Sequence, residues 1–119
     1  MENKKSGNFV IRKLPIDLQM SPIHSFAVDD FNHDGITDFI AGGNFYANQI
    51  NIGKCDASYG HLLTLKNENG ELKWKTLSLL ESGFAIDGEV RDIKVLKGEG
   101  DKKFVLVSKN NEYLDLFSF

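Results

Sequence analysis

Apolar residues alternate with polar ones over short stretches of the chain, and clusters of Gly, Asn and Asp separate these stretches. Alternation with a period of two is typical of β-strands, whereas an amphipathic helix needs a longer uninterrupted stretch with a different period. The pattern therefore predicts an all-β protein. The predicted strands are residues 9–14, 24–29, 38–42, 59–66, 71–77, 89–97, 103–108 and 113–119.

The turn residues between these strands predict antiparallel neighbours. Residues 67–70 read Asn-Glu-Asn-Gly, and Asn and Gly accept the positive φ angles that tight hairpins need. Pro15 ends the first strand, because proline has no N–H to donate to a neighbouring strand. Four consecutive strands over 24–77 and three over 89–119 follow, so we expect two antiparallel sheets.

An offset of 65 residues relates the two sets of strands and places Val28 on Ile93 and Phe39 on Phe104. Tandem repetition of four-stranded antiparallel units is how β-propellers are built. The repeat therefore favours two propeller-like four-stranded antiparallel blades, the second of them one strand short. An irregular β-sandwich whose strand spacing matches by coincidence is the alternative.

The connection between the second and third predicted strands carries the most informative motif. Its sequence, DFNHDGITD over residues 30–38, fits DxNxDGxxD. Oxygen-bearing side chains at these intervals can turn inward on one ion, and Ca²⁺ prefers six to eight oxygen ligands. The predicted calcium ligands are the side chains of Asp30, Asn32, Asp34 and Asp38 and the backbone carbonyl of Ile36.

Further details of the loop narrow the choice of metal. Gly35 allows a sharp turn after the third ligand, since positive φ is free of strain only without a Cβ. An EF-hand is excluded, because position 12 counted from Asp30 is Ala41, where that motif needs Glu. Magnesium wants a tighter octahedron, and zinc would find only His33, at an outward position. The alternative is an acidic turn without metal, in which Asp and Asn accept hydrogen bonds from their own backbone.

Residues 26–44, which contain this loop and its flanking strands, resemble the FG-GAP/VCBS repeat of integrin α-subunit propellers and bacterial surface proteins. With residues 44–46, 56–60 and 87–93, the likeness extends to the C-terminal end of bacterial VCBS-repeat proteins of the ASPIC/UnbV-associated type. The resemblance implies structural Ca²⁺ and an extracellular or cell-surface location. It also implies a complete blade over 24–77, an outer strand of a preceding blade over 8–14, and a three-stranded final blade over 89–119.

The final blade of this scheme lacks a fourth strand, and an unpaired strand edge invites pairing. Either residues 8–14 complete the last sheet within the chain, or two copies of the chain form a homodimer through exposed strand edges. Residues 97–101 contain too few acidic positions for a second calcium loop, so one metal site is expected.

Composition sets the outer limits of the interpretation. A chain of 119 residues with 41% hydrophobic and 26% charged residues predicts one globular unit over 1–119. A net charge of -3 with mixed signs gives no cationic stripe, so nucleic acid is not an expected partner. No apolar run approaches the about 20 residues of a membrane helix, so no membrane insertion is expected. Cys55 is the single cysteine, which excludes an intrachain disulfide and a thiolate metal cluster.

Candidate ligand contacts lie outside the motif. Long connections on rigid sheets concentrate binding residues, which points to Lys54, Asp56 and Tyr59 in and beside the connection 44–58. Glu89 and Arg91 at the start of a predicted inner strand are further candidates, with a salt-bridged strand end as the alternative.

The resemblance implies a role in surface recognition or protein–protein interaction. Catalysis is not expected, because the histidines are scattered and no serine or cysteine motif lies near them. A carbohydrate-binding module and an accessory domain of a larger extracellular enzyme are the alternatives. The protein or glycan ligand is not encoded in any motif. Six aromatic residues are predicted to form an inter-sheet core in preference to a sugar platform: Phe26, Phe39, Phe45, Trp74, Phe84 and Phe104.

Overall fold

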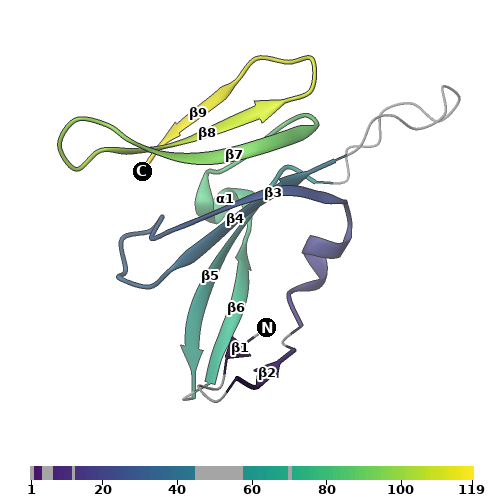
Figure 1. Ribbon diagram of the computed structural model, residues 1–119, viewed down its shortest axis with the longest axis vertical. Helices are drawn as coiled ribbons and strands as arrows, with labels where there is room; N and C mark the ends of the chain where they lie inside the picture. Colours follow the sequence, from purple (N-terminus) through teal and green to yellow (C-terminus); the bar gives the residue numbers. More distant parts are fainter. Residues whose placement is uncertain (1, 4–6, 12, 45–57, 70) are drawn as a thin grey trace, which may run out of the picture.

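The computed structural model describes residues 2–3, 7–11, 13–44, 58–69 and 71–119. This part of the chain is all-β, as predicted, with a four-stranded sheet, a three-stranded sheet and a short two-stranded pair (Figure 1). Its helical segments are short: the 3₁₀ helix η1 (Ile16–Gln19) and the helix α1 (Leu79–Ser82). No helix in these described ranges has the length and apolar character needed to cross a membrane.

The four-stranded sheet contains four consecutive strands in chain order, each antiparallel to the next. They are β3 (Ile23–Asp29), β4 (Asp38–Gly43), β5 (His61–Glu68) and β6 (Glu71–Leu77). These strands confirm the four predicted between residues 24 and 77, with small shifts at their ends. The hairpin between β5 and β6 pairs Glu68 with Glu71, and φ at Asn69 is +54°. The predicted role of Asn as a positive-φ turn residue is thus confirmed.

The three-stranded sheet has the order β7 (Val90–Lys97), β8 (Lys103–Lys109) and β9 (Asp115–Ser118). No fourth strand joins it among the described residues. The prediction that residues 8–14 complete this sheet is wrong, because β2 (Phe9–Val10) pairs with β1 (Glu2–Asn3) instead. The predicted strand over 9–14 is also too long, because β2 ends at Val10 and the described residues 11, 13 and 14 are not in a strand.

The two sheets pack against each other where β7 lies beside β3 and β4 (Figure 1). Gly42 of β4 allows this close approach, because a Cβ there would lie 3.0 Å from the Val90 side chain of β7. Alternate residues of each strand point into the interface, as the period of two requires. The buried core between the sheets consists of Ala27, Ile40, Leu62, Val90, Ile93, Val105 and Val107, closed by Phe84 and Ile86 from the segment that follows α1.

Ser25 makes a polar contact between the sheets and marks a structural repeat. Its Oγ accepts the Ile93 N–H at 3.0 Å and donates to Asp92 Oδ1 at 2.9 Å. Ser25 and Asp92 occupy matching places, since each follows a β-bulge at the start of the first strand of its sheet. They are 67 positions apart, so the repeat offset is not 65. The bulges place Phe26, one residue after Ser25, on Ile93, one residue after Asp92, so the predicted match of Val28 with Ile93 is shifted by two positions.

The outer face of the first sheet carries an aromatic row. Phe26 stacks on Phe39 with ring centroids 5.0 Å apart, and Phe39 meets Trp74 edge-on at 6.3 Å. Leu18 of η1 covers part of this face, and Phe26 is left 59% exposed. The prediction that these rings fill the inter-sheet core is wrong. Successive residues of a strand point to opposite faces, so Phe26 and Phe39 point away from the core face to which Ala27 and Ile40 contribute. Of the predicted core rings, that of Phe84 packs between the sheets. Four others do not belong to that cluster: Phe26, Phe39, Trp74 and Phe104. Phe45 lies outside the described residues.

Candidate functional site

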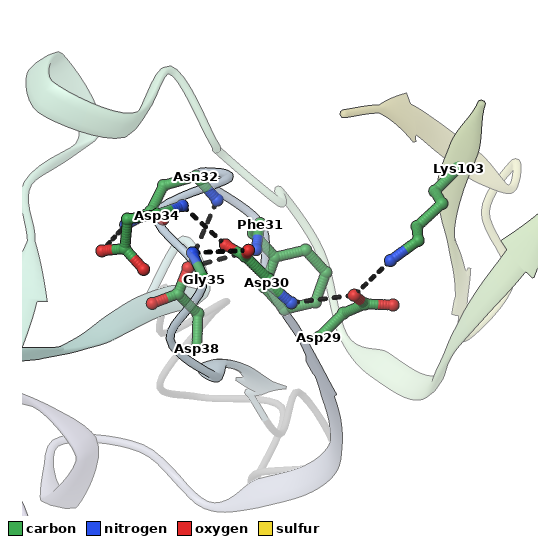
Figure 2. Close-up of polar contacts among 8 residues, drawn as sticks. All are labelled: Asp29, Asp30, Phe31, Asn32, Asp34, Gly35, Asp38 and Lys103. Carbon is green, nitrogen blue, oxygen red and sulfur yellow. Dashed lines mark hydrogen bonds and ion pairs between the residues drawn. The ribbon is translucent and has the colours of Figure 1, made fainter. Parts of the chain in front are cut away.

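The candidate loop, residues 30–38, connects the end of β3 to the first residue of β4. The backbone turns with positive φ at His33 (+59°) and at Gly35 (+81°). Positive φ at Gly35 is what the motif predicts for the residue after the third ligand. Figure 2 shows the side chains of Asp30, Asn32, Asp34 and Asp38 gathered around this one turn.

Side-chain oxygens hold the loop in shape by accepting backbone N–H groups. The Asp30 carboxylate accepts the N–H of Asp34 at 3.1 Å and that of Gly35 at 2.9 Å. Asn32 Oδ1 also accepts the Asp34 N–H, at 3.0 Å, and Asp34 Oδ1 accepts the Ile36 N–H at 2.8 Å. These bonds hold the side chains of Asp30, Asn32 and Asp34 against the backbone of one turn. An acidic turn without metal and a calcium loop share this part of the geometry.

Asp38 is the feature that a solvated acidic turn does not explain. It is 0% exposed, and its Oδ2 accepts the N–H groups of Phe31 and Asn32 at 3.1 and 3.3 Å. Its Oδ1 is buried and has no hydrogen-bond partner among the residues that the structure describes. Burial raises the pKa of this carboxyl above its ordinary value of 3.8, and the charges of Asp34 and Asp30 act in the same direction. A buried carboxylate oxygen without a partner is costly, and a cation is one kind of group that would satisfy it.

The donor set of the loop fits a hard divalent cation. Each carboxylate oxygen that accepts one N–H keeps a second lone pair for a metal, and the amide oxygen of Asn32 adds a neutral donor. In the described ranges, no three or more His, Cys, Asp or Glu side chains are grouped closely enough to form a metal site by themselves. The carboxylates of Asp30, Asp34 and Asp38 therefore do not form such a group on their own, and the predicted set also includes Asn32 and the Ile36 carbonyl. His33 takes no part in it and instead stacks on Phe119 at 6.2 Å.

Glu89 and Arg91, two of the predicted ligand contacts, are brought together as an ion pair. Glu89 is 2% exposed, its Oε1 lies 2.7 Å from the Arg91 guanidinium, and its Oε2 accepts from Asn110 at 3.0 Å. The contact of Arg91 with Glu89 is an ion pair and not an aligned hydrogen bond, because no described residue meets Oε1 with hydrogen-bond geometry. This arrangement matches the alternative of a salt-bridged strand end. Lys54 and Asp56 lie outside the described residues.

Tyr59, the remaining ligand candidate, lies on the wall of an open pocket between η1 and the start of β5. Sequence reasoning missed the pair beside it. Ser58 Oγ lies 2.9 Å from His61 Nε2 and accepts the Gly60 N–H at 3.1 Å. Burial lowers the pKa of His61 below its ordinary value of 6.5, while Asp17, on the same pocket wall, opposes this shift.

The lowered pKa of His61 predicts a specific loss of stability in mild acid. As the pH falls below 6.5, the unfolded chain takes up a proton at this histidine before the folded chain does, so the free energy of unfolding decreases. Replacing His61 with glutamine should make this decrease smaller, measured by urea unfolding at pH 7.5, 6.5 and 5.5. His24→Gln, at an exposed position of β3, is the control and should follow the native slope. Equal slopes for the native chain and His61→Gln would contradict the prediction.

A second feature that sequence reasoning missed joins the loop to the second sheet. Lys103, the first residue of β8, places its Nζ 2.5 Å from Asp29 Oδ1 (Figure 2), and the same oxygen accepts the Asp30 N–H at 2.8 Å. The Lys103 ammonium holds the pKa of the Asp29 carboxyl below its ordinary value of 3.8. No local signal could have revealed this pair, because its members are far apart in the sequence.

The described residues thus bring four of the predicted oxygen-bearing side chains onto one turn, with a buried carboxylate at its base. The resemblance to FG-GAP/VCBS repeats depends on the same segment and stays a prediction. Comparison of the chain with known protein families, with curated proteins and with solved structures finds no match.

Proposed function

We propose that this chain is a calcium-stabilised β-repeat module of the FG-GAP/VCBS type, whose role is recognition or assembly at a cell surface and not catalysis. The observation that carries the proposal is the buried Asp38 carboxylate at the base of a DxNxDGxxD loop, whose Oδ1 has no hydrogen-bond partner in the described part of the chain. A calcium ion would supply that partner and would neutralise the carboxylates of Asp30 and Asp34, which otherwise repel Asp38.

The role proposed for the ion is structural. The loop joins β3 and β4, which are paired along their length. The pair nearest the loop is Asp29 with Asp38. Ligands on both sides of the turn would hold these strands in one register, because metal binding favours the folded arrangement over the unfolded chain.

The arrangement of the sheets supports assignment of each sheet to a propeller-like blade. The first sheet is a four-stranded antiparallel meander, and both sheets begin with a bulged strand at matching positions, Ser25 and Asp92. The first strands of the two sheets lie beside each other. Apolar side chains also occupy the outer faces, for example Phe26 on the first sheet and Leu116 on the second. Units stacked in series would have such faces on both sides.

Thermal unfolding with calcium and with a chelator tests the proposal. For a Kd on the order of 10⁻⁴ M, about 10 mM calcium is about 100 times Kd and should stabilise the fold by about 2.7 kcal/mol. For a chain of this size the melting temperature should rise by about 10 °C. An equal concentration of magnesium should have a smaller effect, because magnesium dehydrates reluctantly.

Two variants complete this experiment. Asp34→Ala should melt at the same temperature with and without calcium, because it lacks a central ligand. Asp101→Ala removes an exposed acid from the β7–β8 turn, the corresponding connection in the second sheet, and should keep the full calcium response. Identical melting curves for the native chain with calcium and with chelator would overturn the proposal.

A further inference from the structure

The C-terminal residue Phe119 packs directly on the candidate loop. Its ring lies 4.7 Å from that of Phe31, edge to face, and 6.2 Å from that of His33. Phe31 follows the first predicted ligand, and its backbone N–H donates to the buried Asp38 carboxylate. The ring of Phe119 thus contacts residues whose backbone shapes the ligand set.

Lys103 links the same end of the second sheet to the loop by charge. Its ammonium pairs with Asp29, whose carboxylate in turn accepts the backbone N–H of Asp30. The ammonium also lies 5.7 Å from the centre of the Phe119 ring, and the Phe119 N–H donates to the Lys103 carbonyl at 3.2 Å. Lys103 and Phe119, named here the clasp residues, therefore form one unit that holds the start of the loop from the neighbouring sheet.

We propose that the clasp residues Lys103 and Phe119 are positioning residues for the calcium site, so that cation binding to the loop and docking of the second sheet strengthen each other. This inference depends on the proposed function, because it assigns a regulation to the same site. The clasp residues do not supply ligands. They act through Asp29 and Phe31, which fix the backbone on which the ligands Asp30 and Asn32 are carried.

The physical basis is preorganisation. A loop already held in its binding shape loses less conformational freedom when it binds an ion, so it binds more tightly. Coupling between two sites is reciprocal, so an ion that orders the loop must also stabilise the contact with the second sheet. Couplings of this kind typically change affinity by about 5- to 150-fold.

A purely structural role is the competing explanation, because Phe31 and Phe119 also pack against the inter-sheet core. Phe117 of β9, two residues before Phe119, offers a matched comparison. Its ring packs on Phe84 at 4.8 Å, within the core and away from the loop. Loss of the Phe117 ring should weaken the fold without changing the affinity of the loop for calcium.

The test is calorimetric titration with calcium chloride of the native chain and four variants, each first shown by circular dichroism to be folded at the titration temperature. We expect Phe119→Ala to raise the calcium Kd by about 5- to 50-fold, Phe119→Tyr to restore it, and Phe117→Ala to leave it within about twofold of the native value. Lys103→Gln, which keeps the aromatic contact, should raise the Kd less than Phe119→Ala and serves as the test if Phe119→Ala does not fold.

The outcomes separate the two proposals. Native-like calcium affinity in Phe119→Ala, or in Lys103→Gln where that variant replaces it, overturns the clasp while the calcium site stands. An equal rise in Kd for Phe117→Ala also overturns it, because general loosening then explains the effect. If the native chain itself binds no calcium, the proposed function fails and the clasp fails with it.

Hydrogen exchange supplies a readout of the reciprocal effect. In the native chain, calcium should slow exchange of amides in β8 and β9 and of the Phe119 amide, although these groups lie outside the loop. The Asp34→Ala variant should show no such change on addition of calcium. Slowing confined to residues 29–38 in the native chain would contradict the coupling.

Discussion

Replacing Asp38 with asparagine is expected to remove the stabilisation by calcium and to leave the calcium-free protein at least as stable as the native chain. The amide has nearly the same shape and keeps one oxygen to accept the N–H groups of Phe31 and Asn32. It lacks the negative charge that burial makes costly. Because burial raises the pKa of Asp38, the ionised carboxylate reduces the stability of the calcium-free fold at neutral pH.

The two expected effects have opposite directions, which makes this variant more informative than a simple loss of a ligand. At a calcium concentration of about 100 times Kd, the native chain should gain about 2.7 kcal/mol in free energy of unfolding, and Asp38→Asn should gain almost nothing. Urea unfolding of both proteins with calcium and with chelator measures this. A variant that is much less stable than the native chain in chelator would show that Asp38 is a structural acid, and a full calcium response would show that it is not a ligand.

Replacing Ile86 with alanine is expected to lower the free energy of unfolding by about 2–5 kcal/mol. Ile86 is 0% exposed and belongs to the core between the sheets. Its N–H donates to the Tyr59 carbonyl at 2.8 Å, and its side chain packs on the backbone at Gly60. The cavity left by the shortened side chain would lie where the segment after α1 packs against both sheets. The two sheets hold the neighbouring groups in place, so these groups would fill the cavity only in part.

A loss of this size is a large part of the stability of a domain, which is usually about 5–15 kcal/mol. Urea unfolding followed by circular dichroism measures it. Leu80→Ala is the matched control, because this leucine lies in the same connection but is 99% exposed, and its loss should change stability by less than about 0.5 kcal/mol. A loss below about 1 kcal/mol for Ile86→Ala would show that the two sheets do not depend on this segment for their packing.

Together these variants separate two sources of stability in the fold. Ile86 reports on apolar packing between the sheets, which does not depend on ions. Asp38 reports on a charged group that the fold buries and that the proposed calcium ion would neutralise. A module with both features would be expected to fold without calcium and to become more rigid when calcium is present.

The sequence by itself determined the features that depend on near neighbours. Alternation within each segment predicted the strands of both sheets, because side chains of successive residues point to opposite faces whatever the sheet packs against. The turn at Asn69 and the positive φ at Gly35 followed from the backbone freedom of those residue types. The gathering of Asp30, Asn32 and Asp34 on one turn is local in the same sense.

Only the tertiary structure decided which face of each strand is covered and what lies beside the loop. Phe26 and Ala27 are equally apolar in a sequence pattern, but the second sheet covers Ala27 and leaves Phe26 largely exposed. Asp38 is an ordinary member of the motif until the packing of the loop buries it. The contact of Phe119 with Phe31 depends on where β9 ends after two sheets have formed. Such relations arise from the packing of distant segments, and no local period or turn residue records them.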